Sequence, residues 1–242
     1  MSEPVYWSIA LAAAFLAGLA KTGVPGLGIL IVPLLALLFP ARQSVGALLP
    51  LLIVGDVATV ILFRRHAQWR LLGRLAPWTL AGMVAGGWAL THLDDQRLRP
   101  FLGGLILVLV GLELLRRGVA WLNRPQPPWF TAGAGALTGF ATTVGNVAGP
   151  VMNLFLVGKG MARQEFMGTV GWFFLLINLT KVPLFVHLDM ITAHTLRFDL
   201  IVALVVVAGA LAGRRLLHAL SDRLFHTLIL ILAAASGLQL LF

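Results

Sequence analysis

The chain has 242 residues, of which 59% are hydrophobic and only 11% are charged. This composition excludes an ordinary soluble domain, which carries roughly 25% charged residues to keep its surface in water. A formal net charge of +9 would favour nucleic-acid binding in a soluble chain. Most arginines, however, flank apolar segments, so we expect a lipid bilayer and no nucleic acid as partner. The chain has no cysteine, which excludes disulfides and Cys-ligated metal.

Apolar runs separated by polar breaks predict about eight membrane segments, near residues 5–39, 44–63, 75–91, 100–115, 129–157, 166–186, 198–214 and 224–242. The first has neither a basic leader nor a clear cleavage site, so we expect it to be retained. The first and fifth are too long for one crossing, and each predicts two half-helices around a break, at 21–28 and at 142–150. We therefore expect an all-α polytopic helix bundle.

The two halves of the chain share a register. Ala41-Arg42-Gln43 recurs 121 positions later as Ala162-Arg163-Gln164, and residues of both breaks align at the same shift. A Pro-rich linker at 123–128 separates the halves, which predicts a first repeat over 1–122 and a second over 129–242. Duplicated broken helices are typical of transporters whose site lies where the breaks meet.

Loop charges predict how these halves are oriented. The loop after the second segment is strongly basic and so is the linker, which places both in the cytoplasm, whereas the loop with Asp94 and Asp95 is neutral. In the second half the loop with Asp189 is neutral and the next one, with Arg214 and Arg215, is basic. Equivalent loops thus lie on opposite sides, which predicts an inverted repeat with hairpin-like broken segments. A parallel repeat of straight crossings is the alternative.

A glycine- and proline-rich break at membrane depth is tolerated only where protein or water covers the backbone, so we expect both breaks to line a cavity. A half-helix restarts after each break, and its free N–H groups make a site suited to an anion such as sulfite, sulfonate or carboxylate. Lys21 adds a full positive charge. The predicted binding residues in the breaks are Lys21, Thr22, Gly23, Pro25, Gly26, Gly28, Thr142, Thr143, Gly145, Asn146, Gly149 and Pro150. The alternative is structural: threonines that satisfy broken backbone and glycines that permit close packing.

Three further polar residues lie inside apolar segments. Asn178 and Lys181 are three residues apart on one helix face, so both can address the cavity, although Lys181 could instead snorkel to the interface. Asp56 is costly at this depth unless it is paired or protonated. Proton coupling through Asp56 and a structural salt bridge to Lys21 are the two hypotheses.

These motifs resemble the TauE/SafE family of sulfite exporters. The likeness lies in Ala20-Lys21-Thr22-Gly23-Val24-Pro25-Gly26-Leu27-Gly28-Ile29 and Val32-Pro33-Leu34-Leu35, and in Gly149-Pro150-Val151-Met152-Asn153, Arg163-Gln164-Glu165-Phe166 and Asn178-Leu179-Thr180-Lys181-Val182-Pro183. The resemblance covers the whole chain. It implies a bacterial inner-membrane transporter of sulfite or organosulfur anions, driven by the proton motive force.

Other function classes fit the sequence less well. An intramembrane enzyme would need a catalytic constellation, and the chain has no H-E-x-x-H, no G-x-S-x-G and no cysteine. We expect no metal and no cofactor. An anion channel or a noncatalytic membrane subunit are the alternatives to a proton-coupled anion exporter, and an oligomer is possible.

Overall fold

The computed structural model describes residues 2–23, 27–63, 67–92, 94–118, 128–157, 159, 161 and 163–216, and five positions between 231 and 241. Helices are the only regular secondary structure in these ranges. Nine of them are described: α1 (Glu3–Thr22), α2 (Gly28–Ala36), α3 (Ala41–Phe63), α4 (Trp69–His92), α5 (Asp95–Gly118), α6 (Pro128–Gly145), α7 (Gly149–Val157), α8 (Arg163–His187) and α9 (Ala193–Leu216).

Both long segments are broken, but not into two half-helices. The 20 residues of α1 and the 18 of α6 each form one helix, about 30 Å and about 27 Å long at 1.5 Å per residue, so neither is half-length. Only α2 and α7, with nine residues each, are half-length. The expectation of paired half-helices was therefore wrong for the first member of each pair, because the Ala-, Leu- and Gly-containing stretch before each break stays helical.

Helix ends differ from the predicted segments where polar turns extend an apolar run. The helix α4 begins at Trp69 rather than near 75, and α5 begins at Asp95 rather than near 100. Hydropathy marks the apolar interior of a membrane helix and misses the charged turns that continue it into the interface. The linker and the predicted last segment at 224–242 lie almost entirely outside the described residues, so the division into two repeats stays a prediction.

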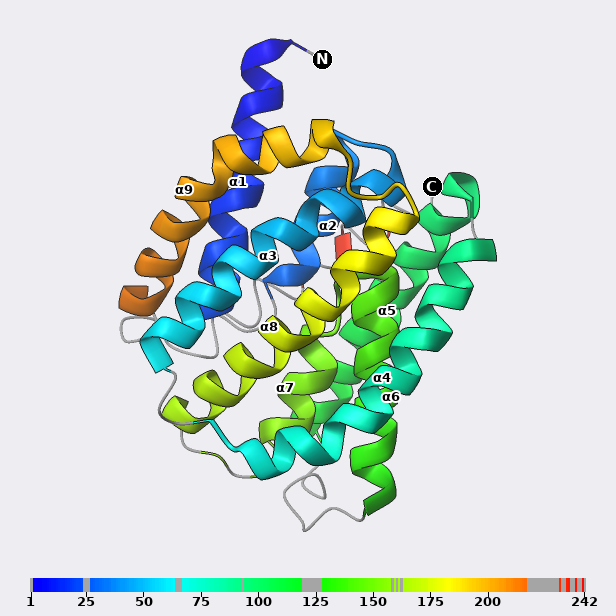
Figure 1. Cartoon of the computed structure of the whole chain (residues 1–242), viewed down its shortest axis with the longest axis vertical. Coiled ribbons are helices and arrows are strands. Elements are labelled where there is room, and N and C mark those ends of the chain that lie inside the picture. The colour runs from blue at the N-terminus through cyan, green and yellow to red at the C-terminus, as the bar shows by residue number, and fades with distance from the viewer. Residues whose placement is uncertain are drawn as a thin grey trace.

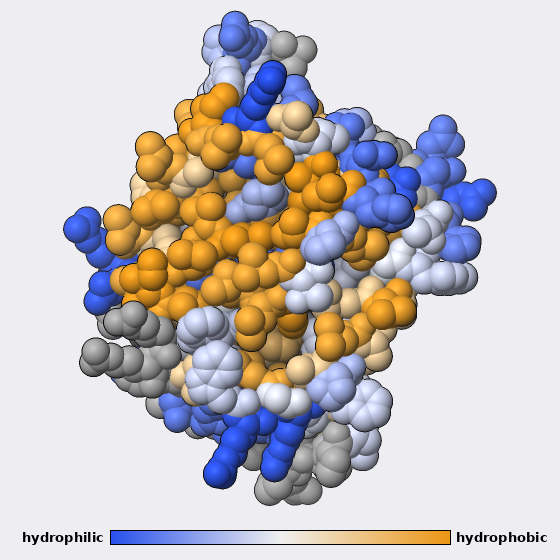
Figure 2. All heavy atoms as spheres, in the orientation of Figure 1, coloured by the Kyte–Doolittle hydropathy of each residue, from blue (hydrophilic) through white to orange (hydrophobic). Residues whose placement is uncertain are grey.

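Four described helices are long and apolar enough to cross a membrane: Glu3–Thr22, Arg42–Phe63, Gln164–His187 and Ala193–Leu216. Figure 2 shows apolar side chains over the middle of the visible face and hydrophilic ones toward its upper and lower ends. Large exposed side chains on α9 such as Leu200, Ile201 and Leu204 are apolar. A soluble protein rarely exposes so much apolar surface, so the solvent for this face is lipid and the protein is a multi-pass membrane protein.

The helices α1 and α9 pack backbone against backbone in parallel. A Cβ added at Gly18 would lie 1.9 Å from the carbonyl oxygen of Val206, and one added at Gly209 would lie 2.1 Å from that of Phe15. Only glycine permits such an approach, as is usual between membrane helices. Tyr6 contacts Phe198 near the start of both helices and Gly23 packs on Gly213 near their ends, so the two helices run parallel.

The helices α4 and α6 repeat this packing with different residues. A Cβ at Gly139 would lie 2.0 Å from the carbonyl oxygen of Thr79, and one at Gly82 would lie 2.0 Å from that of Ala136. Gly139 and Ala136 stand 121 positions after the corresponding residues of α1, and Thr79 and Gly82 stand 127 positions before those of α9. The two helix pairs are thus two copies of one packing arrangement.

Between these pairs, α3 and α8 lie side by side in the middle of the bundle (Figure 1). Asp56 contacts Asn178, whereas Thr59, further along α3, lies against Gly171, earlier in α8. The two helices are therefore antiparallel. Their contact joins the α1–α9 side of the molecule to the α4–α6 side and carries the buried polar residues described next.

Candidate functional site

A buried ion pair joins the end of α1 to the middle of α3. Lys21, in the last turn of α1, places its Nζ 2.6 Å from Asp56 Oδ1, with 11% of the lysine side chain and none of the aspartate exposed. Gly55 makes room for the lysine stem, and the ammonium also lies 4.6 Å from the centre of the Phe174 ring. The hypothesis of a salt bridge between Lys21 and Asp56 is confirmed.

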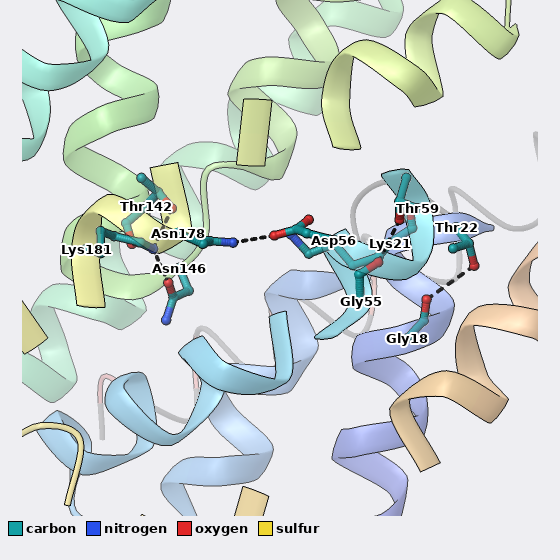
Figure 3. Close-up of polar contacts among 10 residues, drawn as sticks. All are labelled: Gly18, Lys21, Thr22, Gly55, Asp56, Thr59, Thr142, Asn146, Asn178 and Lys181. Atoms are coloured by element: carbon teal, nitrogen blue, oxygen red, sulfur yellow. Dashed lines mark hydrogen bonds and ion pairs between the residues drawn. The ribbon is translucent and has the colours of Figure 1, made fainter. Parts of the chain in front are cut away.

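The second oxygen of the same carboxylate is held from the other half of the chain. Asn178 Nδ2 on α8 donates to Asp56 Oδ2 at 2.6 Å (Figure 3). One carboxylate thus takes an ammonium on one oxygen and an amide on the other, the arrangement that binds an oxyanion. Asn178 Oδ1 is buried, and no described residue donates to it, so that acceptor is available to a ligand hydroxyl.

Lys181 lies one turn beyond Asn178 and is completely buried. Its ammonium donates to the backbone oxygen of Thr142 at 2.9 Å, to the hydroxyl of Thr142 at 2.9 Å and to Asn146 Oδ1 at 2.5 Å. All three ammonium protons are used inside the protein. The snorkelling alternative was therefore wrong, and the lysine ammonium instead lies at the buried carbonyl end of α6, where a cation is favoured by the helix dipole.

Asn146 organises the second break. Its φ of 54° is in the left-handed region, which asparagine adopts more readily than most side chains and which ends α6. While its Oδ1 accepts from Lys181, its Nδ2 donates to the backbone oxygen of Val45 on α3 at 2.8 Å. The amide therefore links the break of one half to the central helix of the other.

Both breaks are shorter than predicted. Lys21 and Thr22 end α1, and Thr142, Thr143 and Gly145 end α6. The non-helical residues described are Gly23 and Leu27 in the first break and 146–148 in the second. Lys21 accordingly lies at the carboxyl end of α1, and the ammonium of Lys181 on α8 lies at the carboxyl end of α6.

Two predicted binding threonines use their single proton elsewhere. Thr22 donates to the backbone oxygen of Ala210 at 2.5 Å, and Thr143 donates to that of Gly139 at 2.8 Å. Both hydroxyls thus satisfy helix carbonyls, which favours the structural role. Gly23 packs on the backbone of Gly213, so this glycine also serves close helix contact.

The remaining break residues are placed less fully. Gly28 and Gly149 begin α2 and α7 and have open space where a side chain would be. Pro150 is the second residue of α7, where a proline is tolerated, but its side chain lies outside the description. Pro25 and Gly26 lie outside the described residues. A convergence of the two restarting helix ends stays a prediction.

Two buried polar residues were not predicted from the sequence. Thr59 lies beside the Lys21–Asp56 pair, and Asp199 is a second buried carboxylate. Thr59 on α3 lies 3.2 Å from the backbone oxygen of Lys21 and 2.8 Å from that of Gly55, and it donates at this point to the α1 terminus. Asp199 on α9 is only 4% exposed, and neither carboxylate oxygen has a hydrogen-bond partner among the described residues. The available signal for Asp199 was its place at the edge of the apolar run 198–214.

Charged side chains buried inside a multi-pass helix bundle are typical of membrane proteins that bind or transport a polar solute. Residues 10–240 match the profile of the sulfite exporter TauE/SafE family. The chain belongs to this family of membrane transporters, as its motifs suggested. No curated protein and no solved structure matches the chain.

Proposed function

We propose that the protein is a secondary transporter that carries a small oxyanion, of the sulfite, sulfonate or carboxylate type, across the bacterial inner membrane. The main observation is how the Asp56 carboxylate is bound. Lys21 Nζ on α1 lies 2.6 Å from its Oδ1, and Asn178 Nδ2 on α8 donates to its Oδ2 at 2.6 Å. A substrate oxyanion offers the same pair of acceptor oxygens. The site that holds Asp56 is therefore a receptor for an oxyanion, occupied by a side chain of the protein itself.

We also propose that the two halves form an inverted repeat. The duplicated packing of α1 on α9 and of α6 on α4 supports this proposal, because each pair takes one helix from either half. The antiparallel contact of α3 with α8, the corresponding helices of the two halves, supports an inverted relation over a parallel one. In such transporters the substrate binds near the bilayer midplane, at the interface of the repeats. Asp56 and Asn178 meet at this interface.

Substrate binding then proceeds by exchange. An incoming oxyanion takes the place of the Asp56 carboxylate on Lys21 and Asn178, since the buried ammonium must keep an anionic partner. The released carboxylate takes a proton, because an unpaired charge at this depth is costly. Asn178 Oδ1, which has no donor among the described residues, accepts a hydrogen bond from a protonated oxygen, either of Asp56 or of the ligand. Anion and proton are therefore bound together.

This order of events sets the energetics of transport. A monovalent anion that moves with one proton carries no net charge, so membrane potential does not drive it. An inward proton gradient favours inward movement of the pair, and export requires an anion concentration that is higher inside. On this proposal the anion gradient drives export, in contrast to the proton-motive drive that the family resemblance implies.

Counterflow in proteoliposomes tests the function. Vesicles that contain the purified protein and are loaded with unlabelled sulfite, sulfonate or carboxylate are expected to accumulate the labelled anion transiently. A channel cannot produce this accumulation. Lys21→Ala should reduce this exchange at least tenfold and Lys21→Arg should retain part of it, whereas the exposed Lys159→Ala serves as the matched control. Exchange that is unchanged in Lys21→Ala would remove the proposed receptor.

Proton coupling is measured separately in the same vesicles. An imposed pH gradient, acidic on the side of the labelled anion, should accelerate uptake by the wild-type protein and not by Asp56→Asn. Counterflow that persists in Asp56→Asn without this acceleration assigns the coupling to Asp56. Acceleration retained in the variant would leave Asp56 with only its structural role.

A further inference from the structure

A second buried carboxylate lies on α9, away from the Lys21 site. Asp199 lies in the second turn of α9, is 4% exposed, and has neither oxygen hydrogen-bonded among the described residues. Phe198, beside it, contacts the rings of Tyr6 on α1 and Phe39 before α3. An unpaired carboxylate in such surroundings is unfavourable as an ion and stable as a neutral acid.

The duplicated packing shows that the fold does not require an acid at this position. Residues of α9 correspond to those of α4 at a shift of 127, and the buried face of α4 repeats that of α9 at this shift. The counterpart of Asp199 is Leu72, which is also buried. The same packing position thus accepts an apolar side chain in one half and carries a carboxylate in the other.

Charged and titratable groups on the elements around Asp199 have other positions or partners. Lys21 and Asp56 pair with each other, and Arg42 on α3 donates to the backbone oxygen of Leu90. Described groups of this kind on α1, α3 and α9 are Glu3, Tyr6, Lys21, Arg42, Asp56, His194, Arg197, Arg214 and Arg215. None of them has a hydrogen bond or ion pair to Asp199, so no described cation is at hand to hold the ionised form.

We propose that Asp199 is a proton-binding site, separate from Asp56. The carboxylate takes one proton from water and becomes a neutral acid, and it returns that proton when α9 moves so that the group is hydrated. A metal cation fits less well, because it needs several oxygen ligands. The hydroxyl of Thr195, one turn away on the same face, already donates to the Thr192 carbonyl and accepts from its N–H.

The packing connects this site to the Lys21 receptor. Gly18 of α1 lies directly on Val206 of α9. Thr22, the residue after Lys21, donates a hydrogen bond to the backbone oxygen of Ala210 on α9. A movement of α9 that hydrates Asp199 therefore displaces the end of α1 that carries Lys21. On the proposed transport function, which this step requires, proton binding at Asp199 favours one orientation of the receptor.

Infrared difference spectroscopy on the purified protein in nanodiscs tests the proton site without any transport. A pH titration should show the carbonyl band of a protonated acid in an apolar environment, lost in Asp199→Asn and in Asp199→Leu. Asp94→Asn, at an exposed acid, is the matched control and should retain the band. Asp199→Leu places the residue of the corresponding position 72 into the same packing, so it provides a folded variant if the asparagine does not fold.

The outcomes separate the alternatives. A band that disappears in both Asp199 variants and persists in Asp94→Asn establishes the site. Absence of such a band in the wild-type protein, or its loss on adding sodium chloride in place of choline chloride at constant pH, would overturn the proposal, the latter in favour of a metal cation. Counterflow measured on Asp199→Leu tests the coupling step alone: a smaller acceleration by the pH gradient with the exchange itself retained supports coupling, since Asp56 still contributes, and an unchanged acceleration refutes it.

Discussion

Neutralising one member of the Lys21–Asp56 pair should damage the protein far more than replacing both. Lys21→Met leaves Asp56, which is completely buried, with Asn178 as its only described partner. Breaking a buried pair in this way costs about 3–5 kcal/mol, because an uncompensated charge remains inside. For a chain of this size that loss corresponds to a fall in melting temperature on the order of 10 °C.

The double variant Lys21→Met/Asp56→Leu removes both charges together with their desolvation cost. Replacement of buried pairs by apolar residues is neutral or stabilising by about 1–4 kcal/mol, and the unpaired Asn178 amide takes back about 1–3 kcal/mol. The double variant should therefore unfold within about 2 kcal/mol of the wild type, with a coupling free energy of at least about 3 kcal/mol, because the two single changes together cost more than that.

The wild type, the two single variants and the double variant form a double-mutant cycle. Denaturant unfolding in detergent micelles, followed by tryptophan fluorescence, measures the stability of all four proteins. Asp56→Leu is the fourth corner, and it strands Lys21, whose 11% exposure and contact with Phe174 soften the cost. A double variant as unstable as the sum of its two single changes would refute the buried pair. So would a Lys21→Met protein with wild-type stability.

Three further changes test the polar core and the helix packing. Unfolding measures the two polar changes, and size exclusion measures the glycine change. Lys181→Met should lower the free energy of unfolding by about 3 kcal/mol, since three buried acceptors lose their donor, and an unchanged stability would mean that the ammonium is not buried. Gly18→Leu should abolish recovery of folded protein on size exclusion, because its Cβ would strike the Val206 carbonyl, whereas Gly28→Ala should be recovered normally; equal recovery would contradict the α1–α9 packing. Asn146→Ala should cost about 1 kcal/mol more than Asn146→Gly, which tolerates the positive φ, and a reversed order would contradict the left-handed turn.

Much of the helical architecture follows from the sequence because lipid imposes a simple rule. Apolar runs must form helices there, and the Gly-, Pro- and Asn-containing stretches mark where a helix cannot continue. Both breaks were predicted in the correct regions for this reason. Their edges were not: Thr142 stays helical and accepts a hydrogen bond from Lys181, a tertiary neighbour, and Thr143 stays helical and donates within α6 to the Gly139 backbone oxygen.

The site was predictable only where charge alone decides the partner. A buried aspartate needs a cation or a proton, and Lys21 was the available cation for Asp56. The contact with Asn178 depends instead on how α3 crosses α8, which periodicity does not reveal. Asp199 was not singled out from the sequence, because its burial depends on the packing of α9 and an acid at the edge of the apolar run 198–214 does not reveal it.

The two halves stabilise the same backbone position by different chemistry. Thr59 on α3 donates to the backbone oxygen of Lys21, and Lys181 on α8 donates to that of Thr142, which stands 121 positions after Lys21. In one half the contact is a neutral hydroxyl, so the lysine at the helix end is left to hold an anion. In the other half the lysine itself makes the contact, and its protons are all engaged. On the proposed function the duplication therefore leaves one lysine to bind the anion and one as a fixed support, which is why exchange of the anion is expected at Lys21 and not at Lys181.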